Sequence, residues 1–171
     1  HVMFFSDVQG RMTPQSVMSQ LEWAAIRGVK VVLLDHISFI FSGDKGSGNE
    51  RKEIDVLMTD LASFVKRTGV HLIVVAHVAR DKNRPKPKNS DGTIKYPYWY
   101  EVEETDARGS GAFEQVCWNM IGIDKQVLES KERGLARVRV MLNREWDYTG
   151  FGDTWTLDMH TGGLKVITED Y

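Results

Sequence analysis

Two short apolar runs, each ending on a polar residue, constrain the fold of this chain more than any other feature. The run "VKVVLLD" covers residues 29–35, and "LIVVAH" covers residues 72–77. An amphipathic helical pattern precedes each run, at about 14–27 and 50–68, and a glycine follows each helix. Continuous apolarity is typical of strands covered on both faces, and a helix between two such strands predicts a parallel βαβ crossover. The sequence therefore predicts an α/β fold with a mostly parallel central sheet flanked by helices.

The C-terminal third predicts antiparallel strands at the edge of that sheet. A short helix is expected to begin near Gly111, followed by an apolar strand from about residue 118 to 123. The segment "ARVRVMLNR" alternates in polarity, and "TWTLDMHTGGLKVI" reads as a closing hairpin with its turn at "HTGG". The chain opens on "HVMFF", which reads as a strand entered midway. We therefore expect residues 1–171 to form a single domain, truncated at its N-terminal side.

Composition excludes several classes of protein. The single cysteine, Cys117, cannot form an internal disulfide, and one Cys with five His gives no zinc-type spacing. The longest apolar runs are far too short to span a bilayer, and no signal-peptide pattern opens the chain. We therefore expect a cytoplasmic protein with no membrane partner. Because the net charge is only -2, bulk charge does not predict a nucleic-acid partner, although a local concentration of charge can.

Asp35 and His77 each end one of the two apolar strands. The carboxyl ends of parallel strands are where α/β sheets place their ligands. A carboxylate there can hold Mg²⁺ through its water shell, and an imidazole there can contact a phosphate. The alternatives are an ordinary capping acid and a core histidine with satisfied hydrogen bonds, and neither residue excludes them alone.

A long segment, residues 79–107, follows His77 and is rich in basic residues and proline at its start. Basic side chains on a long loop bind nucleic-acid phosphates without reading sequence. The four aromatic residues at 96–100 could stack bases, but packing within the loop is the better interpretation, and acids at 101–106 argue against a DNA contact there. The candidate DNA-binding residues are Arg80, Lys82, Arg84, Lys86 and Lys88.

Two further features are weak alone. "RGSGAFEQ" at 108–115 is a glycine-rich turn entering a helix, which exposes backbone N–H groups to an anion. Arg144 follows an alternating strand and could reach the nucleotide of a neighbouring subunit. The alternatives are a simple turn and a surface arginine.

Taken in order, five segments resemble one family: "VVLLDHIS", "ERKEIDVLMTDL", "LIVVAHVAR", "ARGSGAFEQ" and "LNREWDYTGFGDTWTLDMHTGG". The chain resembles the RecA-like P-loop NTPase motor of hexameric DnaB-type replicative helicases. It is most similar to the helicase half of phage primase-helicases and to the related mitochondrial helicase. The resemblance implies NTP-driven 5′ to 3′ translocation on single-stranded DNA, with Mg²⁺ and ATP or dTTP as cofactors.

The resemblance also implies a role for individual residues. Asp35 matches the Walker B aspartate that holds Mg²⁺-nucleotide, and His77 matches a phosphate sensor. Arg144 resembles the arginine finger given to the adjacent subunit. The motif that links DNA to the nucleotide site is matched by Arg108, Gly109 and Gln115, with Arg108 and Gly109 on the DNA side and Gln115 on the nucleotide side. The implied partners are single-stranded DNA, five further copies in a hexamer, a primase domain and a replicative polymerase.

This chain departs from the family in two ways. Where phage relatives sandwich the nucleotide base between Arg and Tyr, it has Lys125 and Leu157. No G-x-x-x-x-G-K-[ST] loop occurs, because "GDKGSG" at 43–48 lacks its spacing and ending. The chain is therefore expected to be the C-terminal part of the motor and to be inactive alone. The alternatives are a non-catalytic RecA-like module that binds single-stranded DNA or assembles partners, and a RecA-type recombinase.

Overall fold

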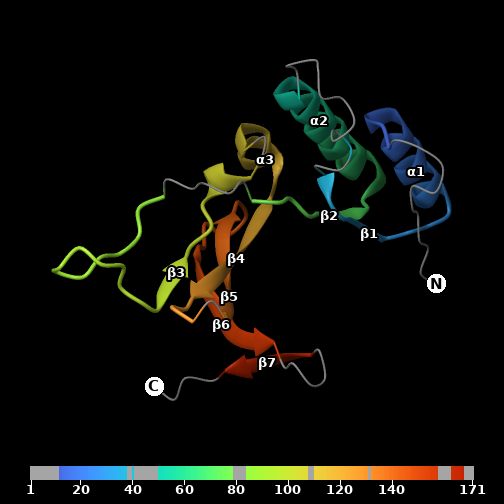
Figure 1. Cartoon of the computed structure of the whole chain (residues 1–171). Helices are drawn as coiled ribbons and strands as arrows, with labels where there is room; N and C mark the ends of the chain where they lie inside the picture. The colour runs from blue at the N-terminus through green and yellow to red at the C-terminus, as the bar shows by residue number, and fades with distance from the viewer. Residues whose placement is uncertain are drawn as a thin grey trace. The chain divides into compact units, whose positions relative to one another are not determined.

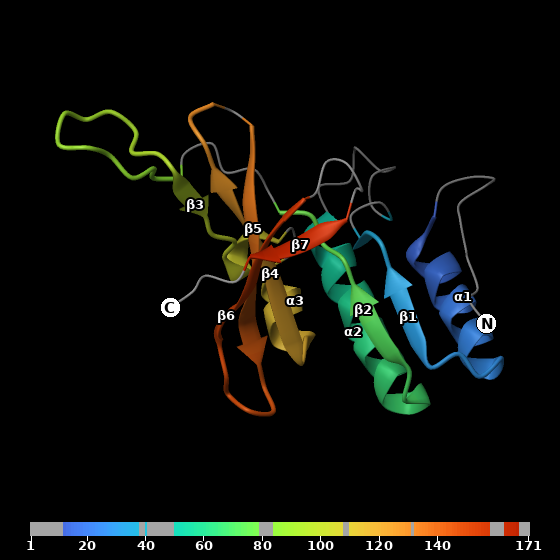
Figure 2. The ribbon, with the colours of Figure 1, turned by 90° about the horizontal axis from the view of Figure 1, so that it is seen from below.

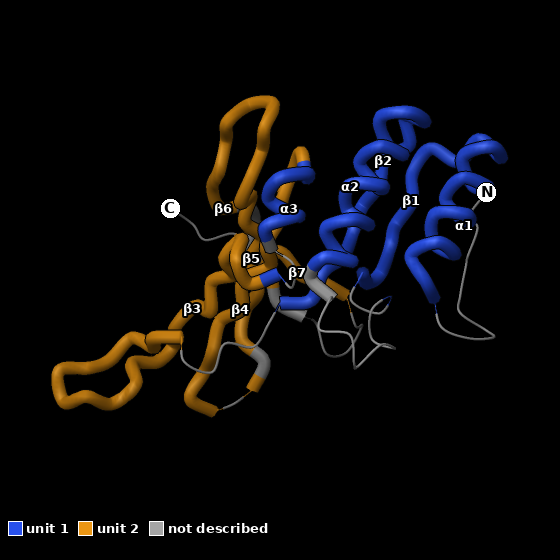
Figure 3. The backbone as a smooth tube through the Cα atoms, turned by 90° about the horizontal axis from the view of Figure 1, so that it is seen from above, with its two compact units in different colours: residues 1–79, 107–117 blue, residues 80–106, 118–171 orange. Residues whose placement is uncertain are grey.

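The computed structural model describes residues 12–37, 40, 50–78, 84–107, 110–130, 132–157 and 163–167. The chain divides into two compact units (Figure 3), which are described separately below. The first comprises residues 1–79 and 107–117, and the second comprises 80–106 and 118–171. Three segments discussed from the sequence lie wholly or mostly outside the described residues: the opening strand, the "GDKGSG" stretch at 43–48 and the "HTGG" turn. That the chain forms one domain stays a prediction.

The first unit begins with helix α1, Pro14–Ile26, whose start the sequence predicted. Thr13 is the N-cap, and its side-chain oxygen accepts a hydrogen bond from the Ser16 N–H at 3.1 Å. The Ser16 hydroxyl accepts one from the Thr13 N–H at 2.9 Å, which completes a capping box. The helix ends before Gly28, where φ is +80° and a side chain would be strained.

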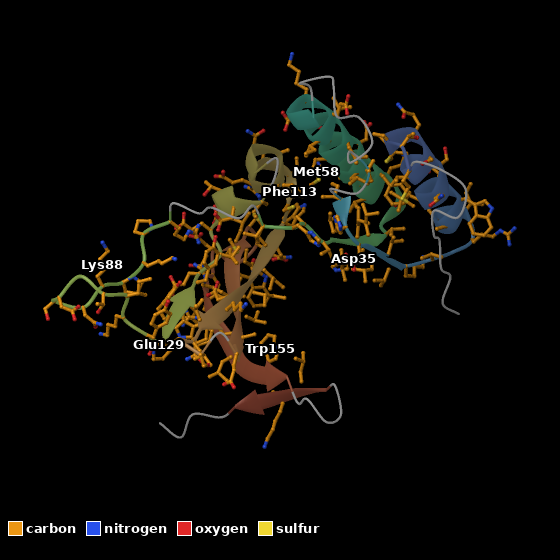
Figure 4. The ribbon with its side chains drawn as sticks, viewed as in Figure 1. Asp35, Met58, Lys88, Phe113, Glu129 and Trp155 are labelled. Carbon is orange, nitrogen blue, oxygen red and sulfur yellow. The ribbon has the colours of Figure 1, made fainter. Side chains whose placement is uncertain are left out.

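The predicted parallel pair is present in this unit (Figures 1 and 2). Strand β1, Val31–Leu34, pairs with β2, His71–Val74, with Val31 opposite His71. Helix α2, Glu50–Thr68, is the crossover, and its buried face carries Ile54, Leu57, Met58, Leu61 and Phe64. Helix α3, Ser110–Val116, packs against α2 through a face with buried Ala112 and Phe113 (Figure 4, where Met58 and Phe113 are labelled).

The coverage of this small sheet differs from the expectation of two covered faces. Helices α1 and α2 lie on one face of the β1–β2 pair (Figures 1 and 2). On the other face, Val31, Leu33 and Ile73 are 58%, 62% and 45% exposed. Apolarity on both faces was therefore a correct signal for a parallel strand, but among the described residues helices cover only one face.

The second unit is a five-stranded antiparallel sheet in the order β3-β4-β5-β6-β7. Its strands are Tyr98–Tyr100, Asn119–Val127, Arg133–Asn143, Gly150–Leu157 and Leu164–Ile167, and a short 3-10 helix, η2, spans Glu104–Asp106. The predicted closing hairpin is confirmed as β6–β7. However, the expectation of a mostly parallel sheet is wrong for the described strands, because only β1–β2 is parallel. Short connections after β4, β5 and β6 permit hairpins, whereas parallel pairing needs a long crossover.

Within the part of the chain that the structure describes, no helix is both long and apolar enough to cross a membrane.

Candidate functional site

Asp35 and His77 lie at the same edge of the β1–β2 pair, as the sequence predicted. Both strands point the same way, and the backbone pairing continues past their ends. The Val75 N–H donates to the Leu34 carbonyl at 2.9 Å, and the Ile37 N–H donates to the Val75 carbonyl at 3.0 Å. The side chains of Asp35 and His77 are both exposed at this edge. They are therefore available to a ligand outside the carboxyl ends of the strands.

His36 is a residue of this edge that sequence reasoning missed. Its ring stacks on the ring of His77, with centroids 3.7 Å apart and an interplanar angle of 28°. The signal was present in the sequence, because a second histidine directly follows Asp35. However, a stack between residues on different strands depends on their register, which the sequence does not show.

The Asp35 carboxylate fits the expected Mg²⁺. It is exposed at the end of β1, and oxygen ligands are those that Mg²⁺ prefers. Mg²⁺ usually keeps several waters and takes one or two carboxylates together with substrate phosphates, so one carboxylate is a sufficient protein ligand. Among the described residues, no three His, Cys, Asp or Glu side chains are grouped to hold a metal ion.

The long segment after His77 begins and ends at one place. Val78, the next residue, forms an isolated antiparallel bridge with Ala107. Ala107 directly precedes Arg108 and Gly109, which lie outside the described residues. Helix α3 follows, with Gln115 exposed on it. The bridge therefore joins the strand end that carries His77 to the start of the motif that contains Gln115.

Two of the predicted DNA-binding lysines lie on a hairpin-like loop that extends from β3 (Figures 1 and 2). Lys88 forms an isolated antiparallel β-bridge with Ile94. Next to it, the Lys95 N–H donates to the Pro87 carbonyl at 2.9 Å. Lys86 and Lys88 are exposed, and Lys88 is labelled in Figure 4. Exposed ammonium groups on an ordered loop can contact phosphates. Arg80 and Lys82 lie outside the described residues.

Arg84 differs from these lysines, because its guanidinium is already engaged. Nη2 donates to both carboxylate oxygens of Asp106, at 2.6 and 2.7 Å, and Nη1 donates to the Glu101 carbonyl. The guanidinium also lies 4.6 Å from the centre of the Tyr100 ring. Burial lowers the pKa of Arg84, but the hydrogen bonds and charge of Asp106 outweigh it and leave that pKa above its usual value. A DNA contact by Arg84 stays a prediction, and it would compete with these bonds.

A second charged cluster, around Asp124, fixes the same segment to β4 and β5. The Asp124 side chain is fully buried, accepts from the Val102 N–H at 2.8 Å and pairs with Arg137 Nε at 3.1 Å. Arg137 lies between two aromatic rings, 4.3 Å from Trp99 and 4.0 Å from Phe151. Trp99 therefore packs against a cation of β5, outside its own segment, whereas Tyr100 packs on Arg84 and Tyr96 lies against Tyr98 within it. The interpretation that the aromatic residues pack within the loop holds for these three tyrosines and not for Trp99.

The remaining predicted site residues belong to the second unit. Lys125 is exposed on β4, opposite Tyr100, and Leu157 ends β6, opposite Leu164. Strand β5 separates β4 from β6, so Lys125 and Leu157 are not neighbours across one strand pair. Arg144 is exposed directly after β5, with its backbone N–H donating to the Trp118 carbonyl at 3.0 Å. The roles assigned to these three residues stay predictions.

Comparison with known proteins gives three findings. The model of an AAA domain family matches residues 1–83. The DNA helicase/primase of Enterobacteria phage T3 is 36% identical over 139 residues, which are 81% of this chain and 22% of that protein. A solved structure of a DnaB-like replicative helicase and its interactions with primase matches 91% of this chain and 35% of that one, with a TM-score of 0.58 and 13% identity. The structural likeness shows the fold, and the chain spans about a fifth of the length of the phage relative.

Proposed function

Because this chain is homologous to a phage DNA helicase/primase and has the fold of a DnaB-like replicative helicase, we propose that it is the C-terminal part of a helicase motor. The full-length protein would form a hexameric ring that uses Mg²⁺ and ATP or dTTP to move 5′ to 3′ on single-stranded DNA. The phosphate-binding loop would lie upstream of this chain, so the chain alone is expected to be inactive. A primase domain and a replicative polymerase are the partners that fit this role.

The proposed mechanism assigns different work to different residues. Asp35 would hold the Mg²⁺ of the bound nucleotide, and that ion would supply positive charge to the phosphates. His77 contacts the γ-phosphate and reports whether it is present. Gln115 faces the nucleotide site, and Arg144 stabilises developing charge on the transferred phosphoryl group in the neighbouring subunit. Lys125 and Leu157 would lie against the nucleotide base.

DNA binding is assigned to the segment that follows His77 and to Arg108 and Gly109, which come directly after it. Lys86 and Lys88 contact backbone phosphates, together with Arg80, Lys82, Arg108 and Gly109. These contacts carry no sequence information, which suits a motor that must move along any strand. Arg84 mainly holds the segment in shape, because its bonds to Asp106 and Glu101 would have to break before it could reach DNA.

One observation carries this proposal: the Val78–Ala107 bridge. It pairs Ala107, the last residue of the candidate DNA segment, with Val78, which directly follows the candidate phosphate sensor His77. A change in His77 when the γ-phosphate leaves would therefore reach the DNA segment through two backbone connections. Such a short link between the two sites is what a motor that couples hydrolysis to movement requires.

The test is unwinding of a forked duplex by the full-length protein with Mg²⁺ and NTP. A helicase of this polarity should require a 5′ single-stranded tail on the strand it encircles, and should not start on a 3′ tail alone. Strand exchange without unwinding would support the recombinase alternative. Binding to single-stranded DNA without NTP hydrolysis would support the non-catalytic module. Hydrolysis by the isolated chain would contradict the assignment of the phosphate-binding loop to an upstream segment.

A further inference from the structure

Two imidazole rings stack at the edge of the sheet where the nucleotide site is proposed. His36 follows Asp35 directly, and His77 follows strand β2, so the stack joins two neighbouring strand ends. The ring centroids are 3.7 Å apart, and the rings are within 28° of parallel. The proposed mechanism uses His77 and leaves His36 without a role.

The protein restrains the two histidines of the stack to different degrees. His36 is half-buried, and the next residue, Ile37, is 1% exposed. The Ile37 N–H donates to the Val75 carbonyl, which fixes the end of β1 to the chain that continues from β2. His77 is exposed, and an exposed side chain exchanges rotamers unless a neighbour restricts it. The restraint therefore acts from His36 on His77.

A ring stack restrains a histidine in a way that suits contact with a phosphate. It fixes the plane of the ring, while the ring edge, where both nitrogens lie, stays accessible. We propose that His36 is a positioning residue that holds the His77 ring in the plane from which an edge nitrogen contacts the γ-phosphate. This inference rests on the proposed function of His77. In this role His36 acts through His77 and not by a contact of its own with nucleotide or DNA.

The stack also connects the parts that a motor must couple. Asp35, the proposed metal ligand, directly precedes His36 in the chain. His77 directly precedes Val78, which forms the β-bridge with Ala107. Loss of the stack should therefore weaken the response of hydrolysis to DNA more than it weakens nucleotide binding.

The experiment measures NTP hydrolysis by the full-length protein, with and without saturating single-stranded DNA. Because misplacing a contact residue by a small distance costs large factors in rate, H36A should lower DNA-stimulated kcat on the order of tenfold or more. KM for the nucleotide should stay within about twofold, since His36 makes no contact with it. H36F keeps a flat ring and should recover most of the stimulated rate. H36L has similar apolar bulk without a flat ring and should resemble H36A.

A double-mutant cycle with H77A tests whether His36 acts through His77. In the H77A background, H36A should cause little further loss, because the residue that it positions is already absent. Equal losses from H36A in both backgrounds would overturn the inference, as would wild-type rates in H36A and H36L or an H36F as slow as H36L. Thermal unfolding of each variant identifies any that fail to fold, in which case the comparison of H36F with H36L decides. An active wild-type protein with unaffected variants contradicts only this inference, whereas an inactive wild-type protein contradicts the proposed function as well.

Discussion

Arg84 and Asp106 are 22 residues apart in the chain and form an ion pair in which a single nitrogen, Nη2, lies 2.6 and 2.7 Å from the two carboxylate oxygens. The pair is mostly withdrawn from water, with side-chain exposures of 18% and 9%. Asp106 also accepts a hydrogen bond from the Glu103 N–H at 2.7 Å. The ion pair therefore closes the segment from residue 84 to 106 into a loop of defined shape, which carries Lys86 and Lys88.

Substituting Arg84→Ala should loosen this loop. The change leaves the Asp106 carboxylate without its partner, which costs about 1–3 kcal/mol, or more for a charged group. We expect faster proteolytic cleavage within residues 84–106 and a lower melting temperature. Arg84→Lys is the matched control, because it keeps the charge but has no second nitrogen to reach the Glu101 carbonyl while the first binds Asp106, so it should fall between wild type and alanine. Unchanged proteolysis in Arg84→Ala would mean that the Asp124 cluster alone holds the segment.

Replacing Lys86 and Lys88 together with Gln should weaken binding to single-stranded DNA of every sequence. If each lysine neutralises one phosphate, a plot of the logarithm of the DNA-binding constant against the logarithm of the salt concentration should have a slope that is shallower by roughly 1.4. A fluorescence anisotropy titration at several salt concentrations measures both effects. Lys52 and Lys66 of α2 are also exposed, and the same double substitution there is the control for general loss of charge. An equal effect of the two pairs would contradict the assignment of the loop.

Arg144→Ala should preserve ring assembly and DNA binding but reduce NTP hydrolysis by about 10³-fold, since an arginine finger acts on the transition state of a neighbouring subunit. Mixing subunits tests action in trans. Rings that combine Arg144→Ala with Asp35→Ala subunits contain some interfaces with an intact Asp35 and an intact Arg144. Such mixtures should recover part of the activity that each variant lacks alone. Near-normal hydrolysis by Arg144→Ala would assign that residue to packing.

The first unit contains an ion pair that should make stability depend on pH. Arg67 of α2 donates two hydrogen bonds to Glu22 of α1, and these bonds hold the pKa of Glu22 below its usual value of 4.5. The stabilisation is therefore present above about pH 4.5 and is lost as the pH falls through the lower folded pKa. Both side chains are exposed, so the effect is small.

The measurement is the difference in melting temperature between wild type and Glu22→Gln across this pH range. The difference should be present near neutral pH and should close in acid, because both proteins then carry a neutral side chain at position 22. A difference that persists unchanged in acid would show that the effect comes from packing and not from charge. Arg67→Gln should give the same pH dependence.

Local sequence signals predicted much of the fold. The helix expected at about residues 14–27 is α1, and the apolar runs marked β1 and β2 although, among the described residues, helices cover only one face of this pair. The "TWTLDMHTGGLKVI" pattern predicted the β6–β7 hairpin because both strands and the turn between them are close in sequence. The mostly parallel sheet was wrong because strand direction depends on connections that the apolar pattern does not encode.

The site was predicted less completely, because its contacts join distant residues. Arg84 was grouped with the lysines since its charge is the same, and nothing near it in sequence indicates its pairing with Asp106. His36 was overlooked because its partner lies on another strand. Asp124 follows the apolar run at 120–123 of β4 and lies opposite Arg137, with Arg139 two residues further along β5, and this pattern was a signal that could have predicted the buried cluster.

The central claim, that this chain carries the metal-binding part of a DNA-dependent motor, is tested most directly by one assay. The full-length protein and its Asp35→Ala variant are compared for NTP hydrolysis in Mg²⁺, with and without single-stranded DNA. The account predicts hydrolysis that DNA stimulates in the wild type and that the substitution abolishes, while DNA binding is retained. No hydrolysis by the wild type, or stimulated hydrolysis that survives Asp35→Ala, would contradict it.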